Sequence, residues 1–203
     1  VLISFLSLIL SFVLSDFSNE TVFNNSHTTK PLFYKISGTW GNHEGSLLLW
    51  LLVLTFFIFI FLIKSKNLLK NYRILTVLFQ QVIIIGFFIL LIDSSSPFNY
   101  VFPAPIEGLG LNPILQDPAL AIHPPILYLG YVGSSIIFSS VLAATSLNYI
   151  SKTWAVHIKS WILLSWVFLT IGILLGSIWA YYELGWGGFW FWDPVENISL
   201  MPW

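Results

Sequence analysis

Five apolar stretches alternate with polar segments along the chain. They cover residues 1–14, 46–63, 74–92, 124–150 and 160–182. A helix needs about 20 mainly apolar residues to cross the roughly 30 Å hydrocarbon core of a membrane. The last four stretches are therefore predicted membrane spans, and the first, which is several residues short, is predicted to be the end of a fifth span.

The composition excludes a soluble protein. Hydrophobic residues make up 57% of the 203 residues, and Asp, Glu, Lys and Arg together only 8%, far below the charge density of a water-facing surface. Inside lipid the backbone must satisfy its own hydrogen bonds. The sequence therefore predicts an all-α, polytopic transmembrane helix bundle in a single membrane domain, residues 1–203. A net charge of −1 gives no basic excess for nucleic acid, and the lack of cysteine excludes disulfides and thiol catalysis by this chain.

The few charges are sorted between the connecting segments. The loops 64–73 and 151–159 hold six of the eight basic residues and none of the nine acids. All nine acids lie in the segments 15–45, 93–123 and 183–203. The positive-inside rule places the basic loops on the cytoplasmic or matrix side. The three acidic segments are then predicted outer-face loops, and they contain most of the unusual sequence.

The first outer segment ends in Trp40-Gly-Asn-His-Glu-Gly-Ser46. His43 and Glu44 are candidates for binding a metal or a polar group at the membrane surface. Alternatively, Asn42 or Ser46 caps the following helix, and Glu44 complements its positive N-terminus. The capping interpretation is favoured for this motif taken alone.

The second outer segment contains two dipeptides that are typical of helix starts, Asp117-Pro118 and His123-Pro124, because proline at the first helical position loses no hydrogen bond. This pattern predicts His123 at the mouth of a transmembrane helix. A neutral imidazole is a good ligand for iron or zinc. For a histidine taken alone, a capping or hydrogen-bonded role is the favoured alternative.

The third outer segment is the least ordinary. Five of the seven residues from Trp186 to Trp192 are aromatic, and the other two are glycine. Buried indole N–H groups need partners, and glycine is a poor helix former. Flat rings on such a loop favour a large planar apolar ligand over an ordinary interfacial aromatic belt. Asp193, followed by proline and then by Glu196, predicts a capping box at the start of a helix rather than a catalytic carboxylate pair.

These motifs resemble a known family. The run from Trp186 to Asn197 is similar to the tryptophan-rich WWD signature of haem-handling membrane proteins. The motifs 40–46, 116–125 and 176–185 resemble those of the CcmF family, the haem lyases of the multi-subunit cytochrome c maturation system. The resemblance covers the whole chain with four motifs in order and matches the N-terminal portion of the family.

The resemblance implies a function and a set of site residues. The chain is expected to be a subunit or fragment of a haem lyase that binds haem b transiently at the outer face and presents it to apocytochrome c, whose cysteines form thioethers with the vinyl groups. By position, His123 matches an axial ligand of the haem iron. Trp186, Trp190, Trp192 and Asp193 match the haem platform loop. His43 lies in a family motif, without an assigned iron-ligand role.

The resemblance also implies what this chain does not hold. The second axial histidine, and the two histidines of a transmembrane b-type haem, are expected beyond Trp203 or on another chain. The implied partners are that remaining part of the lyase, a haem chaperone, apocytochrome c and the lipid membrane. His157, in a basic loop, matches no haem-ligand motif and is predicted to be a loop residue.

The abundance of Phe and scarcity of Ala favour an organellar gene. The predicted location is therefore the mitochondrial inner membrane, with the WWD loop facing the intermembrane space. A bacterial inner membrane, with the loop on the periplasmic face, is the alternative.

Three other functions remain open from the sequence. The chain could belong to a WWD haem-transfer protein that delivers haem to a chaperone without forming a thioether. It could be a non-enzymatic structural subunit of a respiratory membrane complex. The third alternative is a metal site built from carboxylates and histidines, namely His43, Asp117, His123, Glu183 and Glu196.

Overall fold

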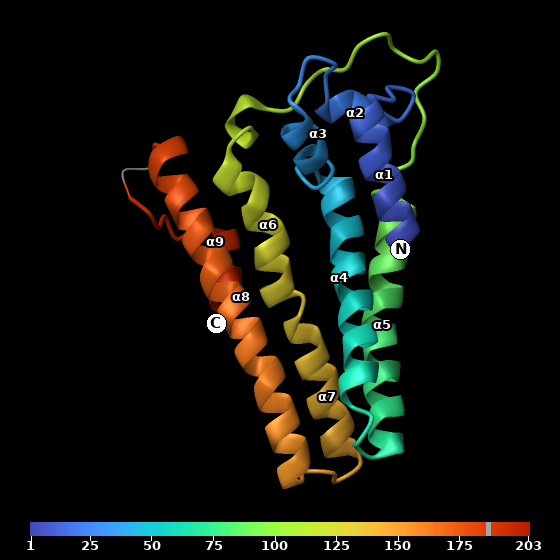
Figure 1. Cartoon of the computed structure of the whole chain (residues 1–203), viewed down its shortest axis with the longest axis vertical. Helices are drawn as coiled ribbons and strands as arrows, with labels where there is room; N and C mark the ends of the chain where they lie inside the picture. Colours follow the sequence, from blue (N-terminus) through green and yellow to red (C-terminus); the bar gives the residue numbers. More distant parts are fainter. Residues whose placement is uncertain (186–187) are drawn as a thin grey trace.

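A computed structural model of the chain describes residues 1–185 and 188–203. Within these residues the regular secondary structure is helical, apart from one isolated bridge between Asn19 and Tyr100. The all-α prediction is confirmed. In chain order the elements are α1 (Leu2–Leu14), α2 (Glu20–Asn25), α3 (Leu32–Gly38), α4 (His43–Lys64), α5 (Lys70–Ser94), the 3₁₀ turn η1 (Pro113–Leu115), α6 (Pro118–Tyr131), α7 (Ser134–Ser146), α8 (Lys152–Glu183) and α9 (Pro194–Leu200) (Figure 1).

Long helices run side by side to form the body of the molecule (Figure 1). Four are long and apolar enough to cross a membrane: α4, α5, α6 continuing into α7, and α8. They correspond to the last four predicted spans. The first predicted stretch forms α1, whose 13 residues are too few to cross the hydrocarbon core. The short helices α2 and α3 gather with α1 at one end of the bundle, where they cover the start of α4.

Two helices begin earlier than the spans predicted for them. The fourth span begins at Pro118 rather than at 124, because the Asp117 side chain accepts a hydrogen bond from the Leu120 amide at 2.9 Å and caps α6 there. It then breaks between α6 and α7, at Val132 and Gly133. The last span begins at Lys152, since Ser151 caps α8 in the same way. His157 is therefore a helix residue rather than a loop residue.

The last predicted outer-face segment, residues 183–203, contains α9. Its last part, α9 and the residues after it, turns back along α8 and does not stay at the outer end. The Trp203 indole donates a hydrogen bond to the Thr170 hydroxyl at 2.8 Å, and its ring lies 6.1 Å from that of Trp166. Thr170 is near the middle of α8. This part of the chain exposes the apolar side chains of Val195, Ile198 and Met201.

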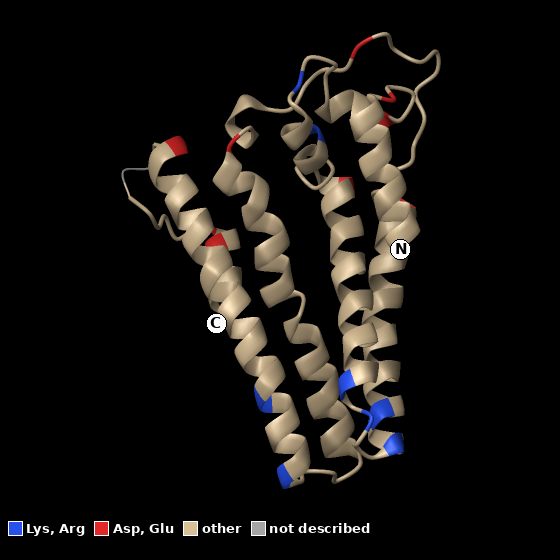
Figure 2. Ribbon diagram, in the orientation of Figure 1, with Lys and Arg blue, Asp and Glu red and all other residues tan. Residues whose placement is uncertain are grey.

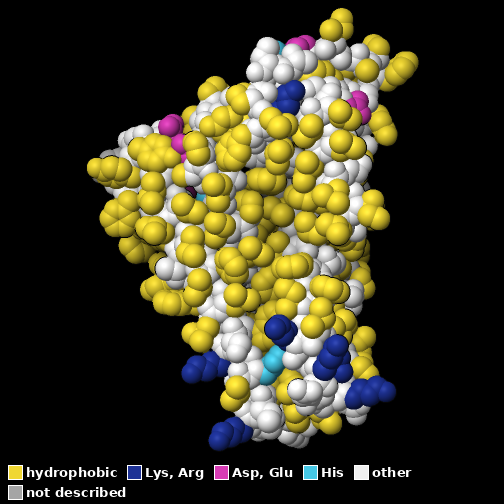
Figure 3. Space-filling model, in the orientation of Figure 1, with side chains coloured by type: hydrophobic (Ala, Val, Ile, Leu, Met, Phe, Trp, Pro, Cys, Tyr) yellow, Lys and Arg dark blue, Asp and Glu magenta, His cyan; other side chains and the backbone are white. Residues whose placement is uncertain are grey.

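The charges divide between the two ends of the bundle. Six of the eight Lys and Arg residues gather at the end where α4 meets α5 and α7 meets α8, and the other two, Lys30 and Lys35, lie at the opposite end. All Asp and Glu lie toward that opposite end or around α8 and α9 (Figure 2). Hydrophobic side chains cover the surface between them (Figure 3). This distribution is the one expected of a bundle whose middle faces lipid and whose ends face water.

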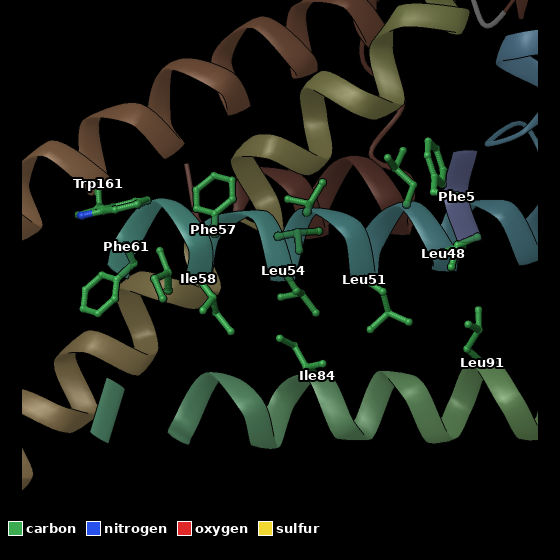
Figure 4. Packing of buried hydrophobic residues seen from close by; sticks show 14 of the residues in the cluster. Phe5, Leu48, Leu51, Leu54, Phe57, Ile58, Phe61, Ile84, Leu91 and Trp161 are labelled. Atoms are coloured by element: carbon green, nitrogen blue, oxygen red, sulfur yellow. The ribbon is translucent and has the colours of Figure 1, made fainter. Parts of the chain in front are cut away.

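The core lies along α4. Leu51 is fully buried and lies between α4 and α5, facing Ile84 and Leu91 (Figure 4). Phe57 and Phe61 pack against Trp161 of α8, with ring centroids 5.7 and 6.2 Å apart. In lipid such packing replaces the hydrophobic effect as the force that joins helices. Part of the phenylalanine excess therefore has a structural role.

Candidate functional site

His123 lies within α6, with Pro124 and Pro125 directly after it. The expectation that His123 sits at the mouth of its helix is wrong, because Asp117 rather than His123 caps α6. The imidazole is instead directed toward α8. Its Nδ1 lies 2.7 Å from the carbonyl oxygen of Gly172. A carbonyl can only accept, so Nδ1 carries the proton and donates.

This tautomer leaves Nε2 with an unprotonated lone pair. None of the described residues makes a hydrogen bond to Nε2. Metal-ligating histidines commonly donate one ring N–H to a carbonyl and bind the metal through the other nitrogen. His123 therefore has a hydrogen-bonding arrangement that metal-ligating histidines commonly have. A structural histidine can make the same Nδ1 hydrogen bond.

The tryptophan-rich loop, residues 186–192, follows α8 in the sequence and precedes α9. The predicted capping box is confirmed: the Asp193 carboxylate accepts from the Glu196 amide at 2.7 Å, and Glu196 accepts from the Asp193 amide at 3.4 Å. Glu196 also accepts from the Phe191 amide at 2.9 Å. One carboxylate therefore orders two backbone groups of the loop. Trp186, a predicted platform residue, lies outside the described residues.

The aromatic rings of the loop divide between the interior and the surface. Trp190 and Trp192 meet edge to face with centroids 5.9 Å apart. Trp192 is 70% exposed and has a positive φ of 62°. Trp190 is more buried. Together with Phe189 and Leu200, the two tryptophans line an open hollow of about 430 Å³ on the outside of the loop.

A smaller cavity lies between the tryptophan-rich loop and His123. It encloses about 100 Å³, and its lining includes His123, Gly176, Trp179, Trp190, Asp193 and Glu196. Three of the predicted site residues, His123, Trp190 and Asp193, are thus brought together by the fold. Trp192 borders the outer hollow and is not part of the lining of this cavity.

Trp179 is a residue of this cavity that the sequence did not single out as a ligand contact. It follows Gly176 by one helical turn on α8, inside the motif 176–185. The indole N–H groups of Trp179 and Trp190 are buried, and neither has a hydrogen-bond partner among the described residues. Buried donors of this kind are uncommon in proteins, and these two border the same cavity as the free His123 nitrogen.

His43 belongs to a different place. Its Nε2 lies 2.9 Å from the Ser95 hydroxyl, and Asn42 caps α4 by accepting from the Gly45 amide at 2.7 Å. The capping interpretation of this motif is confirmed. His43 borders a separate cavity of about 460 Å³ with Trp40 and Pro124, on another side of α6 from the His123 cavity.

The alternative of a carboxylate and histidine metal site is wrong. Across residues 1–185 and 188–203, no three His, Asp or Glu side chains gather closely enough to hold a metal ion. Asp117 and Glu196 have capping roles, and His43 bonds Ser95. His123 keeps Nε2 without a hydrogen bond to a described residue, and it borders the cavity beneath the tryptophan-rich loop.

Comparison with known proteins matches residues 40–203 to the family of cytochrome C assembly proteins. The chain is 53% identical, over its whole length, to the cytochrome c-type biogenesis protein CycK of Rhizobium meliloti, and covers 30% of that protein. It is 46% identical to CcmF of Escherichia coli over 98% of the chain and 31% of the relative. The chain thus spans about a third of the length of these relatives.

A solved structure named Cytochrome c Heme Lyase CcmF has a similar fold. It superposes on the whole chain with a TM-score of 0.80 at 33% identity, and the chain covers 32% of it.

Proposed function

The chain belongs to the cytochrome c assembly protein family, and from that premise we propose that it serves cytochrome c maturation by holding haem at the outer membrane face. In this role it is part of a haem lyase, and it presents haem b for covalent attachment to apocytochrome c. The location fits a bacterial inner membrane with the tryptophan-rich loop on the periplasmic side, since the relatives named above are bacterial. The mitochondrial location stays a prediction.

The convergence of His123 with the tryptophan-rich loop carries the proposal. The histidine comes from α6 and the tryptophan from a loop beyond α8, yet both line one cavity. The pairing of one open imidazole nitrogen with aromatic rings suits haem, which combines a metal needing a nitrogen ligand with a flat apolar ring.

The volume of the cavity beneath the loop limits how much of a haem it can hold. A cofactor site usually has about 300–1,000 Å³, whereas the cavity beneath the loop has about 100 Å³. It therefore accommodates one edge of a porphyrin. The remainder would lie against Trp192 and Phe189 in the larger outer hollow, with the loop shifted from its present position. A partly exposed haem suits a protein that must pass haem on.

The residues of this chain contribute binding and orientation. His123 would hold the iron through Nε2, while Trp190 and Trp192 would support the ring and Asp193 would keep the loop in shape. In the attachment step a cysteine thiol adds across a vinyl double bond, with sulfur on one carbon and the proton on the other. The addition consumes no oxidant or reductant, so the protein's task is to place the two groups together.

The proposal includes partners. A second axial histidine and the ligands of any transmembrane b-type haem would come from the remaining part of the lyase. A haem chaperone would deliver haem, and apocytochrome c would accept it on the same outer face. The lipid membrane surrounds the four long apolar helices.

The deciding experiment is a haem spectrum of the native assembly, purified through a tag on this chain. His123→Ala should lower haem occupancy and cytochrome c maturation by about tenfold or more, while membrane insertion is unchanged. His27→Ala is the matched control, because His27 lies at the same end but pairs with Glu107 at 3.8 Å, away from the cavity.

Each outcome separates one function from another. Normal haem and normal maturation in His123→Ala would overturn the assignment of His123. Haem bound normally by the wild-type assembly, but transferred to a chaperone with no thioether formed, would indicate a haem-transfer protein. A wild-type assembly without haem under reducing, haem-replete conditions would favour a structural subunit.

A further inference from the structure

Two glycines of α8 bring its backbone into direct contact with His123 of α6. A Cβ atom added to Gly176 would lie 2.7 Å from His123 Cε1, 3.1 Å from Nδ1 and 3.3 Å from Nε2. The edge of the imidazole that carries both nitrogens therefore rests directly on the Gly176 backbone. Any side chain at this position would push the ring away.

Gly172 makes the second contact, one turn earlier on α8. Its carbonyl accepts from His123 Nδ1 at 2.7 Å. A Cβ atom added to Gly172 would lie 2.7 Å from the Cα of Leu127, one turn after His123 on α6. The two helices approach so closely because both positions lack a side chain. A larger residue at 172 would separate the helices and lengthen the histidine hydrogen bond.

The two glycines together act on both nitrogens of the ring. The Gly172 carbonyl contacts Nδ1, and the Gly176 backbone lies against the ring edge that carries both nitrogens. His123 has only Nδ1 bonded to a described residue, and its ring borders the cavity beneath the tryptophan-rich loop.

We propose that Gly172 and Gly176 of α8 are positioning residues for His123: the Gly172 carbonyl selects the Nδ1–H tautomer, and the bare Gly176 backbone seats the ring so that Nε2 faces the haem site. The inference rests on the proposed function for the identity of the ligand. The tautomer and ring position, however, are properties of the chain without haem, so they are tested separately.

The first test measures the tautomer in the haem-free assembly, reconstituted in lipid with ¹⁵N-labelled histidine. Solid-state NMR distinguishes a protonated Nδ1 from a protonated Nε2, and the His123 signal is identified by its loss in His123→Ala. We expect a protonated Nδ1 and a bare Nε2. A protonated Nε2 would overturn the proposal without any variant at the glycines.

The second test uses Gly176→Ala, with Gly86→Ala as the matched control. Gly86 lies in α5, and nothing lies within 4 Å of a Cβ added there. In haem-loaded assemblies, Gly176→Ala should lower haem affinity by about 10- to 100-fold and change the spin-state bands of the bound haem. Gly86→Ala should retain the wild-type affinity and spectrum.

The outcomes keep the two proposals apart. If Gly176→Ala binds haem with wild-type affinity and an unchanged spectrum, the positioning role is overturned while the haem function stands. If His123→Ala retains the wild-type haem spectrum, the proposed ligand is wrong, and the NMR result alone then decides the tautomer.

If Gly176→Ala fails to assemble, a second variant, His123→Gly, is tested with imidazole added to the protein. Restored haem binding that is specific for imidazoles with a free N–H would support the Gly172 contact, and equal rescue by N-methylimidazole would oppose it.

Discussion

The indole Nε1 of Trp40 donates a hydrogen bond to the carbonyl oxygen of Ala121 at 2.9 Å. In a regular helix this carbonyl would accept from the amide of residue 125, but residue 125 is proline and has no N–H. Trp40 therefore replaces a hydrogen bond that α6 has lost. The contact ties the segment before α4 to the helix that carries His123.

Trp40→Phe should destabilise the protein by about 1–3 kcal/mol, because it leaves a carbonyl of a membrane-spanning helix without its donor. The measurement is the thermal unfolding midpoint in lipid nanodiscs. Trp50→Phe is the control: Trp50 stacks on Phe87 at 5.1 Å, and no hydrogen bond of its indole is found in the described part of the chain. A loss no larger in Trp40→Phe than in Trp50→Phe would show that the hydrogen bond adds nothing.

A polar contact inside the membrane joins α5 to α7. Gln80 is fully buried, donates to the Ser135 hydroxyl at 2.7 Å and accepts from the Ser139 hydroxyl at 2.7 Å. Gln80→Leu should lower stability by about 1–2 kcal/mol, since both hydroxyls lose a partner in a low-dielectric setting. Gln81→Leu changes the adjacent, exposed side chain and should leave stability within about 0.5 kcal/mol of the wild type. Equal unfolding midpoints for the two variants would contradict this role.

Glu196 is expected to hold the backbone of the tryptophan-rich loop in one conformation. Glu196→Ala removes the acceptor of the Phe191 and Asp193 amides, so amide hydrogen exchange across residues 188–193 should accelerate by about 3- to 30-fold, equivalent to a lost cap of about 0.5–2 kcal/mol. Glu183→Ala, at the exposed end of α8, is the control. Unchanged exchange in Glu196→Ala would exclude the carboxylate as the organiser of the loop.

The lowered pKa of Lys30 is expected to make the stability of the protein depend on pH. Burial, with a smaller contribution from the charge of Lys35, lowers the pKa of Lys30 from 10.5 to about 8. Because this folded-state pKa lies below the unfolded value, the charged form opposes folding. The destabilisation is complete below about pH 8 and disappears as the pH rises toward about 10.5.

Wild-type protein should therefore gain thermal stability from about pH 8 to about pH 10 relative to Lys30→Met, which cannot titrate. Lys64→Met, at an exposed position of the opposite end, should retain the wild-type pH profile. Parallel profiles for wild type and Lys30→Met would contradict the lowered pKa.

Local chemistry in the sequence predicted much of this protein. The lengths of the apolar stretches predicted α4, α5 and α8, and the sorted charges predicted which ends of the helices share a side. The capping residues Asn42 and Asp193 were predicted correctly, because a cap depends on a side chain and an amide only three residues apart.

The position of His123 in its helix was predicted wrongly because the sequence contains two patterns that are typical of a helix start. Asp117-Pro118 and His123-Pro124 both look like helix starts, and only the structure shows that the first one caps α6. The proline pair stays inside the helix because Trp40, far away in the sequence, satisfies a freed carbonyl. Likewise, Trp203 bonds Thr170, so the end of the predicted outer loop lies along α8 instead.

The sequence by itself determined a helical membrane protein, the sorting of its charges and the family to which its motifs belong, since composition and short-range patterns are sufficient for each. The tertiary structure alone decided that His123 points at Gly172, that Trp179 joins Trp190 around one cavity and that His43 lies elsewhere. These relationships depend on which faces of α6 and α8 meet, and packing between residues distant in the chain determines those faces. The helices touch because Gly172 and Gly176 have no side chains.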